Sequence, residues 1–381
     1  MTPPVSSGEL RGARLLTLRH AESLTQAELA KQLDVTQGFI SNVENGLKSL
    51  PREIAAAAAD RFHVPFEFFT VPRSLTDEGF ATFRKASTAT VHDENRVVAS
   101  FGEAARLFQA ASEASGYRTF ELGALRDDDP EATASNVRCV SGLIDEEPVL
   151  NATRIVERLG VGVIHDLVAL PEGKYDHTGI SRPNPFVQRP LVATIGELPP
   201  AVARMTVLHE LGHLIYDRDR SAPIRGIRSP EERRAFRFAS AMLLPAVVAR
   251  ARVTDSLTLH GFLTIKADYG ISVASIIMRA ADLGVISAER KRALMIQLSS
   301  SGWRRDEPVV VAAEKAILLN QATVRSLGDS ARRVASAVGI SYANAARWTG
   351  LPVDPPRDGL ADVIELQPRL SGANHQGRAL G

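Results

Sequence analysis

The residues with the clearest capacity for chemistry are His209, Glu210 and His213, which form the pattern H-E-x-x-H in an apolar stretch. In a helix of 3.6 residues per turn, positions i and i+4 share a face, so the two imidazoles can bind one Zn²⁺ ion. Glu210 is rotated by about 100° from His209, which suits a general base better than a ligand. Zinc lowers the pKa of a bound water towards about 7. The pattern predicts half of a catalytic metal site.

The segments around this motif have the composition needed to position it. Pro199 and Pro200 suit the first turn of a helix, and residues 202–215 would bury one helix face while presenting the histidine pair. Residues 189–195 predict a short strand, to which an extended peptide could add main-chain hydrogen bonds. The alternative is a chance match on a buried helix, expected in roughly one chain in a hundred of this length.

A catalytic zinc needs a third protein ligand and leaves a fourth position for water. Residues 229–245 predict a helix closed by Pro245, on which Glu231 and Glu232 flank the buried face equally. Glu232 also has a structural interpretation, because Ser229 followed three residues later by Glu forms a capping box. Helical periodicity alone leaves the third ligand open.

The segment H-E-L-G-H-L, followed from residue 232 by E-x-x-A-x-x-F-A-x-x-x-L-x-P, resembles the ImmA/IrrE family of zinc metallopeptidase-like proteins. The resemblance covers roughly residues 136–307. It implies Glu232 as the third ligand beside His209 and His213, with Glu210 as the catalytic base. It also implies hydrolysis of a peptide bond in a repressor-type protein. Phe236 departs from the family, which commonly has Asn at this position.

Residues 8–70 predict five short helices. Thr25 and Glu28 form a capping box for the helix 25–33, and Gly46 ends the helix 36–45. The pieces T-Q-A-E-L-A and I-S-x-V-E-N-G resemble the helix-turn-helix of the XRE (phage-repressor-like) family. Short polar side chains on the outer face of the second of these helices fit a major groove. The candidate DNA contacts are Gln26, Gln37, Ser41, Asn42, Asn45 and Lys48.

The alternative for this region is an interaction module that does not bind DNA. Residues 1–71 hold seven Lys and Arg against eight Asp and Glu, which is not a basic footprint. A helix-turn-helix domain with little net charge binds DNA more tightly when two copies act together. We therefore expect a homodimer on a two-fold symmetric operator.

The whole chain has 381 residues, 45 basic against 44 acidic side chains and one cysteine, Cys139. This length suggests two or three domains, and the near-zero charge gives no global attraction to nucleic acid or membrane. One cysteine cannot form an intrachain disulfide, and we expect it to be a buried apolar side chain. The sequence has no segment of 18 consecutive apolar residues and no signal-peptide pattern. We therefore expect a cytoplasmic protein without membrane contact.

The expected fold is α+β and mostly helical. A helix over 146–160, a strand over 161–166 and an antiparallel pair, 174–182 with 187–195, would form a small zincin-like sheet domain. The segments to each side are expected to be a polar linker over 72–95 anchored by Phe83-Arg84-Lys85, a helix over 95–116 and an acidic break at 127–130. The expected domains are a helix-turn-helix domain at 1–71, a connector at 72–135, a metallopeptidase domain at 136–308, a helical module at 309–352 and a disordered tail at 353–381.

The predicted function is a transcription regulator that carries a zinc metallopeptidase domain, which cleaves or inactivates a repressor-type protein, or its own chain, in response to a signal. The linker 72–95 would be the place for a cut or a hinge. The alternative is a non-catalytic DNA-binding sensor whose peptidase-like fold is a pocket for a ligand or partner. The intact Glu210 favours the enzyme, because a simple pocket needs no base there.

Overall fold

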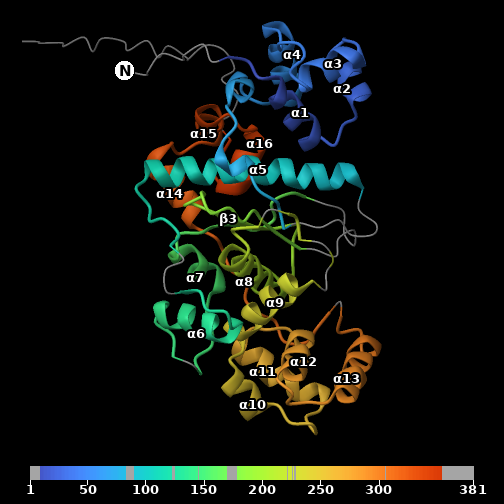
Figure 1. The fold of residues 1–381 in the computed structure, drawn as a ribbon, viewed down its shortest axis with the longest axis vertical. Coiled ribbons are helices and arrows are strands. Elements are labelled where there is room, and N and C mark those ends of the chain that lie inside the picture. Colours follow the sequence, from blue (N-terminus) through green and yellow to red (C-terminus); the bar gives the residue numbers. More distant parts are fainter. Residues whose placement is uncertain are drawn as a thin grey trace, which may run out of the picture.

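The N-terminal region consists of five short helical segments, as the sequence predicts. The computed structural model describes residues 9–82, 90–121, 125–144, 146–169, 178–220, 222–224, 226, 229–304 and 306–353. The segments are α1 (Gly12–Ala21), α2 (Gln26–Gln32), α3 (Gln37–Glu44), α4 (Arg52–Phe62) and the 3₁₀ helix η1 (Phe66–Thr70) (Figure 1). Thr25 and Glu28 form the predicted capping box at the start of α2. The four helices and η1 enclose a separate apolar core that includes Leu15, Ile40 and Phe69.

The 24-residue helix α5 (Val91–Ala114) lies between this region and the sheet (Figure 1). It follows a short 3₁₀ turn, η2 (Leu75–Asp77). Its buried side chains recur with helical spacing, as in Phe101, Ala104, Phe108 and Ala111. The sequence predicts this helix over residues 95–116. In the structure it begins about one turn earlier, because Thr90 and Asp93 form a capping box there.

Among the described residues the sheet has three strands, β1 (Gly162–Ile164), β2 (Gly179–Ser181) and β3 (Leu191–Thr194), in the order β1-β3-β2. Strand β1 is parallel to β3 and β2 is antiparallel to it, so β2 is an edge strand of this sheet. The expectation that a peptide adds to the strand 189–195 is wrong, because that strand is β3, which is already paired on both sides. The two faces of the sheet contribute to different hydrophobic cores. Val163 and Val192 pack in the core that contains α8 (Pro200–Tyr216), whereas Ile164 and Ala193 pack in the core that contains α5.

Helices α8 and α9 (Pro230–Leu243) pack closely against each other. The approach depends on Gly212, because a Cβ there would lie 3.1 Å from both the Cα of Ala235 and the Phe238 ring. Pro200 occupies the first turn of α8, and Ser229 caps α9. These two helices carry the predicted metal ligands.

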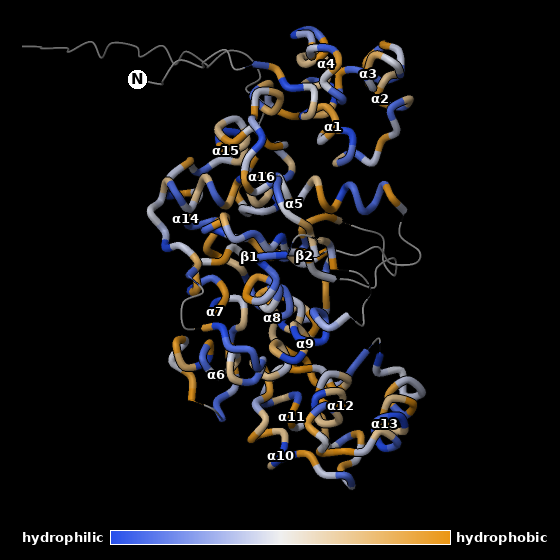
Figure 2. Tube along the Cα trace, in the orientation of Figure 1, coloured by the Kyte–Doolittle hydropathy of each residue, from blue (hydrophilic) through white to orange (hydrophobic). Residues whose placement is uncertain are grey.

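The remaining helices complete the two sides of the sheet. Two lie beside α8 and α9, namely α6 (Pro130–Val140) and α7 (Ala152–Arg158), and a further group follows α9: α10 (Ala246–Arg252), η4 (Leu259–Gly261), α11 (Phe262–Tyr269), α12 (Val273–Asp282) and α13 (Ala288–Ser300). The chain then returns to α5 as α14 (Leu318–Ser326), α15 (Ala331–Val338) and α16 (Tyr342–Thr349). Hydrophobic and hydrophilic residues alternate along the helices, as expected of amphipathic elements (Figure 2).

The helices α14, α15 and α16 lie in the segment 309–352, which was expected to be a helical module, and α15 and α16 form a helix pair within it. In the structure they are packing elements. Val334, Ile340 and Trp348 are buried in the core shared with α5 and the sheet, and the Trp348 indole donates to the carbonyl of Leu167. The turn between them is at Gly339, which has a φ of +71° and lies against η1.

Some expectations differ from the structure. The predicted helix 146–160 is shorter, since α7 starts only after Asn151, whose side chain caps it. Helix α6 was not predicted. Its N-cap, Asp129, and its first residue, Pro130, belong to the acidic break at 127–130, which was expected to be a loop. The domain boundary proposed at residue 135 falls inside α6. Cys139 is exposed rather than buried.

Several expected features lie outside the described residues. They are the Phe83-Arg84-Lys85 anchor, the start of the expected strand 174–182, and residues 354–381 of the expected tail. Among the described helices, none is long and apolar enough by itself to cross a membrane, and one pair, Leu259–Tyr269 with Val273–Asp282, reaches that length and composition only together, with a bend of 99°.

Candidate functional site

Three predicted ligands converge at the contact between α8 and α9. The Nε2 atoms of His209 and His213 lie 3.1 Å apart, and the carboxylate oxygens of Glu232 lie 3.2 Å and 3.3 Å from them. Four donors placed tetrahedrally at about 2.0 to 2.1 Å from a zinc ion are about 3.3 Å from one another. Two nitrogens and a carboxylate at this spacing fit a zinc ion in both geometry and donor type. His209, His213 and Glu232 are a group able to hold a metal ion.

Glu232 combines the two roles that the sequence left open. Its main-chain N–H donates to the Ser229 hydroxyl at 3.3 Å, so Ser229 does cap α9. The Glu232 side chain does not turn back to close a capping box but reaches His209 and His213. Glu231 points elsewhere and pairs with Arg220. The helix cap therefore orients the first turn of α9 while leaving the Glu232 carboxylate for the histidines.

Asp217, the last residue of the stretch that begins at His209, orients one of the histidines. His213 Nδ1 donates to Asp217 Oδ2 at 2.7 Å, so Nε2 is the ring nitrogen that lies towards His209 and Glu232. The other oxygen of Asp217 accepts a hydrogen bond from Arg234 at 2.6 Å. No role was predicted for Asp217. The signal was its position four residues after His213, on the same helix face.

Glu210 is buried against the edge of the sheet. Its Oε2 accepts hydrogen bonds from the hydroxyls of Ser181, on β2, and of Thr82, both at 2.7 Å. Neither partner was predicted, because both are far from Glu210 in the sequence. Gly179 faces the same carboxylate, and a Cβ at that position would come within 2.7 Å of Glu210 Oε1.

The candidate DNA contacts lie on and around α2 and α3. Gln37, Asn45 and Lys48 are exposed, and Ser41 and Asn42 are partly exposed. Asn45 donates its side-chain amide to the carbonyl of Ser41 at 2.9 Å. Gln26 donates to Glu44, which also pairs with Arg19, so the Gln26 amide is already engaged. These residues surround α3 and its C-terminal turn, the arrangement in which a recognition helix presents side chains to a groove.

Two family models match the chain. Residues 12–66 match the family described as helix-turn-helix domain, and residues 156–281 match a peptidase family described as IrrE N-terminal-like domain. This chain joins a helix-turn-helix domain to an IrrE-like domain. The resemblances to a helix-turn-helix domain and to the ImmA/IrrE family are thus confirmed, as is the mostly helical α+β fold predicted from the sequence. No curated protein matches the chain. A DNA-binding domain joined to a peptidase-like domain is the organisation of a regulator.

Burial and hydrogen bonding have opposite effects on the pKa values of His213 and Glu232, two members of the candidate metal-binding group. Burial disfavours the charged His213 ring, but hydrogen bonds to Asp217 and Glu232 raise its pKa to about 9. Burial likewise opposes ionisation of Glu232, yet hydrogen bonds from His209 and His213 lower the pKa of its carboxyl. Two carboxylates therefore favour positive charge between them, which is the electrostatic environment that a divalent cation requires.

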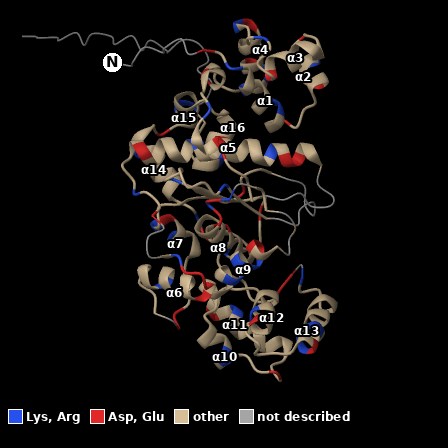
Figure 3. Ribbon diagram, viewed as in Figure 1, with Lys and Arg blue, Asp and Glu red and all other residues tan. Residues whose placement is uncertain are grey.

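A groove of about 850 Å³ opens beside the same group in the IrrE-like domain. It is lined by His209 and Glu232, and by four basic side chains from α9 and α13: Arg233, Arg234, Arg237 and Lys291. Phe236, the residue that departs from the ImmA/IrrE pattern, forms part of its wall. Acidic side chains also line it, and over the whole protein basic and acidic residues are interspersed (Figure 3). His209 and Glu232 thus face solvent on the α9 side, whereas His213 is fully buried.

Two further histidines were considered for substrate contact. His165 lies at the end of β1, where its Nε2 is 3.0 Å from the Thr153 hydroxyl, and burial lowers its pKa. This hydrogen bond to a neighbouring helix is that of a structural histidine. His177 lies outside the described residues.

Proposed function

We propose that this protein is a DNA-binding transcription regulator whose IrrE-like domain is a zinc-dependent peptidase. The observation that carries the proposal is the group of His209, His213 and Glu232, with donor atoms 3.1 to 3.3 Å apart beside a buried Glu210. Its substrate is a repressor-type protein or a segment of its own chain. As a regulator of operator DNA the protein acts in the cytoplasm.

The chemistry follows from the placement of the side chains. His209, His213 and Glu232 hold the metal, and Asp217 keeps the His213 ring in the required tautomer. Zinc, when bound, supplies Lewis acidity towards the scissile carbonyl and the attacking water. Glu210 accepts a proton from that water and delivers it to the nitrogen of the leaving amine. The edge strand β2, which lies beside Glu210, would align an extended peptide through main-chain hydrogen bonds.

The metal assignment is tested by zinc content. Purified wild-type protein is expected to hold about one zinc per chain, and His213→Ala is expected to lose it. His165→Ala is the matched control, because it also removes a buried imidazole but one that lies outside the group. Equal zinc content in all three proteins would show that the ligands are misassigned.

The peptidase assignment is tested by cleavage of co-purified or co-expressed repressor-type proteins. Glu210→Gln is expected to keep the zinc and the fold while slowing cleavage at least about a hundredfold, the typical scale of general-base loss. A chelator should abolish the same cut in the wild type. Cleavage that persists in Glu210→Gln would exclude Glu210 as the base.

A second function is favoured by one observation, the engagement of Glu210 Oε2 by two hydroxyls. In that case the protein is a DNA-binding sensor in which the IrrE-like domain binds a ligand or partner without hydrolysis. The sensor predicts that chelation of zinc changes operator affinity although no polypeptide is cut. The peptidase predicts a cut that depends on Glu210.

The helix-turn-helix domain is proposed to bind a two-fold symmetric operator as a homodimer, with half-sites about one helical turn of DNA apart. Gln37, Ser41 and Asn42 would face the bases, while Gln26, Asn45 and Lys48 would contact the backbone. Gln26 must release Glu44 to do so. Binding-site selection that enriches a palindromic sequence is the expected result, and selection that enriches none would favour an interaction module.

A further inference from the structure

The segment that leaves the helix-turn-helix domain runs along the edge strand β2. The N–H of Thr82 donates to the carbonyl of Ser181 at 2.9 Å, and the N–H of Ser181 donates to the Thr82 hydroxyl at 2.8 Å. Thr82 is 6% exposed. Because β3 lies on the other side of β2, this is the edge to which an added peptide would bind. Here it is covered by the protein's own chain.

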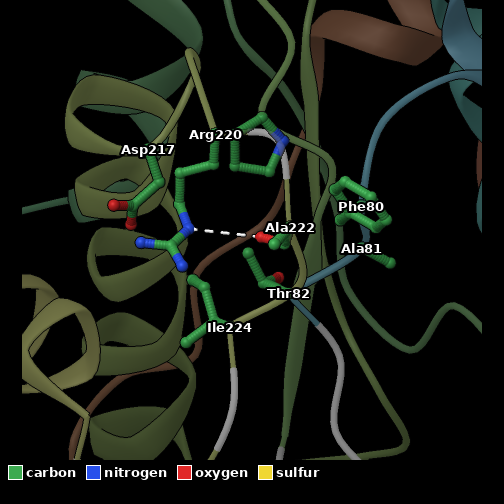
Figure 4. Close-up of a pocket in the computed structure, with 8 residues that line it drawn as sticks. Phe80, Ala81, Thr82, Asp217, Arg220, Ala222 and Ile224 are labelled. Atoms are coloured by element: carbon green, nitrogen blue, oxygen red, sulfur yellow. Dashed lines mark hydrogen bonds between the residues drawn. The ribbon is translucent and has the colours of Figure 1, made fainter.

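Thr82 also covers the proposed catalytic base. Its hydroxyl donates to Glu210 Oε2 at 2.7 Å, while its N–H occupies the carbonyl of Ser181 on β2. Figure 4 shows Phe80, Ala81 and Thr82 across a small cavity from Asp217 and Arg220. That cavity measures about 10 Å³, about enough for one water molecule. This cavity is too small for a peptide while these three residues are in place.

Upstream contacts hold the segment in this position. Arg182, directly after β2, donates to the carbonyl of Thr76 at 2.5 Å, and Asn184 donates to the carbonyls of Leu75 and Glu78, both at 3.4 Å. These are hydrogen bonds to main-chain carbonyls of the turn η2 and of Glu78, so they do not depend on the side chains of the segment. Leu75 and Phe80 remain 48% and 44% exposed, so little apolar burial opposes release of the segment.

We propose that residues 74–82 are an autoinhibitory segment that occupies the peptide-binding edge of the IrrE-like domain and must leave β2 before another polypeptide can bind. This rests on the proposed function in one respect, that β2 is where substrate binds. Thr82 presents a side-chain hydroxyl to Glu210, so the segment blocks the base without offering it a peptide bond. Since the segment directly follows η1, movement of the helix-turn-helix domain would pull it away.

The test uses full-length, metal-free protein and a fluorescein-labelled peptide with the sequence of residues 74–82, S-L-T-D-E-G-F-A-T. Thr82→Pro removes both the N–H that bonds Ser181 and the hydroxyl that bonds Glu210. This variant is expected to bind the peptide at least tenfold more tightly than the wild type. Its Ser181 amide is expected to exchange with deuterium at least tenfold faster when no peptide is present.

Thr82→Ser is the matched control, because it keeps both the N–H and the hydroxyl and should match the wild type in both measurements. If Thr82→Pro does not fold, Thr82→Val removes the hydroxyl alone and should still speed exchange at Ser181, whose N–H loses its acceptor. Equal peptide affinity and equal exchange in the wild type and the folded variant would overturn the proposal.

Peptide binding and exchange need no hydrolysis, so the outcomes separate the two proposals. Tighter peptide binding by Thr82→Pro, without cleavage of any protein by its zinc-loaded form, supports the autoinhibitory segment and contradicts the peptidase. Unchanged peptide binding together with cleavage that depends on Glu210 supports the peptidase and overturns the autoinhibitory segment.

Discussion

Replacing Glu103 by Gln is expected to weaken the attachment of the helix-turn-helix domain to α5. The Arg14 guanidinium of α1 donates to both oxygens of Glu103, at 2.7 Å and 3.0 Å, and to the carbonyls of Phe68 and Gly339. Arg106 donates to Glu103 as well. Arg14 and Glu103 are 5% and 2% exposed, so one carboxylate neutralises two nearly buried arginines. The substitution keeps the shape of the side chain and removes the charge.

The magnitude follows from the burial of the pair. An exposed ion pair contributes at most about 1 kcal/mol, whereas removing one partner of a buried pair costs about 3 to 5 kcal/mol because the other charge stays buried without compensation. Gln retains one acceptor oxygen, so we expect a loss of about 3 kcal/mol. A loss of this size corresponds to an opening equilibrium that is greater on the order of a hundredfold.

Hydrogen exchange followed by mass spectrometry measures this change. Amides in α1 and α5 are expected to exchange on the order of a hundredfold faster in Glu103→Gln than in the wild type, since the most protected amides exchange through the largest openings. The matched control is Glu9→Gln, which removes a carboxylate 3.7 Å from Arg11 in an exposed pair. It should change exchange less than about threefold. If Glu103→Gln behaves like this control, the buried pair does not hold the two domains together.

Three further predictions concern acid, metal and DNA. The buried Glu103 carboxyl has a lowered pKa, since the charges of Arg14 and Arg106 outweigh burial. The contribution of the Glu103 carboxylate to the free energy of unfolding is therefore complete above about pH 4.5, and it is lost as the pH falls through the lower pKa of the folded state. The free energies of unfolding in urea of the wild type and Glu103→Gln should therefore converge in acid. Asp217→Asn should weaken zinc binding by about 10- to 100-fold in competition with a chelator. Asn42→Ala should cost about 1 to 3 kcal/mol at one base position, whereas Lys48→Ala should weaken all sequences equally and reduce the salt dependence of binding.

These three predictions have distinct contrary outcomes. A constant difference between the two urea curves from pH 7 to pH 3 would mean that Glu103 ionisation does not stabilise the fold. Asp268→Asn, which alters an exposed pair with Arg252, is the control for Asp217→Asn and should leave zinc affinity unchanged. Equal zinc binding by both variants would exclude Asp217 as an orienting residue. A uniform effect of Asn42→Ala across all DNA sequences would remove it from base recognition.

Local patterns predicted much of the fold and part of the site. The capping box at Thr25, the glycine after α3 and the spacing of His209 and His213 depend on residues within one or two helical turns, so the sequence alone reveals them. The three-stranded sheet was also expected, although its strands are shorter. Helix α6 was missed, because an acidic cap before a proline resembles a loop until the buried face that follows is known.

Contacts between distant segments could not be read from the sequence. Glu210 meets Thr82 across 128 positions and Ser181 across 29. Neither residue has a motif that marks it, since threonine and serine are common in any polar segment. The choice of Glu232 over Glu231 likewise required either a family resemblance or the three-dimensional approach of α9 to α8, because helical periodicity treats the two carboxylates alike.

The hydrogen bond from Arg14 to the carbonyl of Gly339 spans 325 positions, and this separation has a consequence for synthesis. The helix-turn-helix domain can fold from local contacts once residues up to Thr70 have left the ribosome, whereas the hydrogen bond from Arg14 to Gly339, directly after α15, can form only when residue 339 has also emerged. At about 5 to 20 residues per second, the two events are separated by roughly 10 to 60 s. During that interval the nascent chain carries a folded helix-turn-helix domain that is not yet docked beside α15. A message truncated before Gly339 would make that transient state permanent.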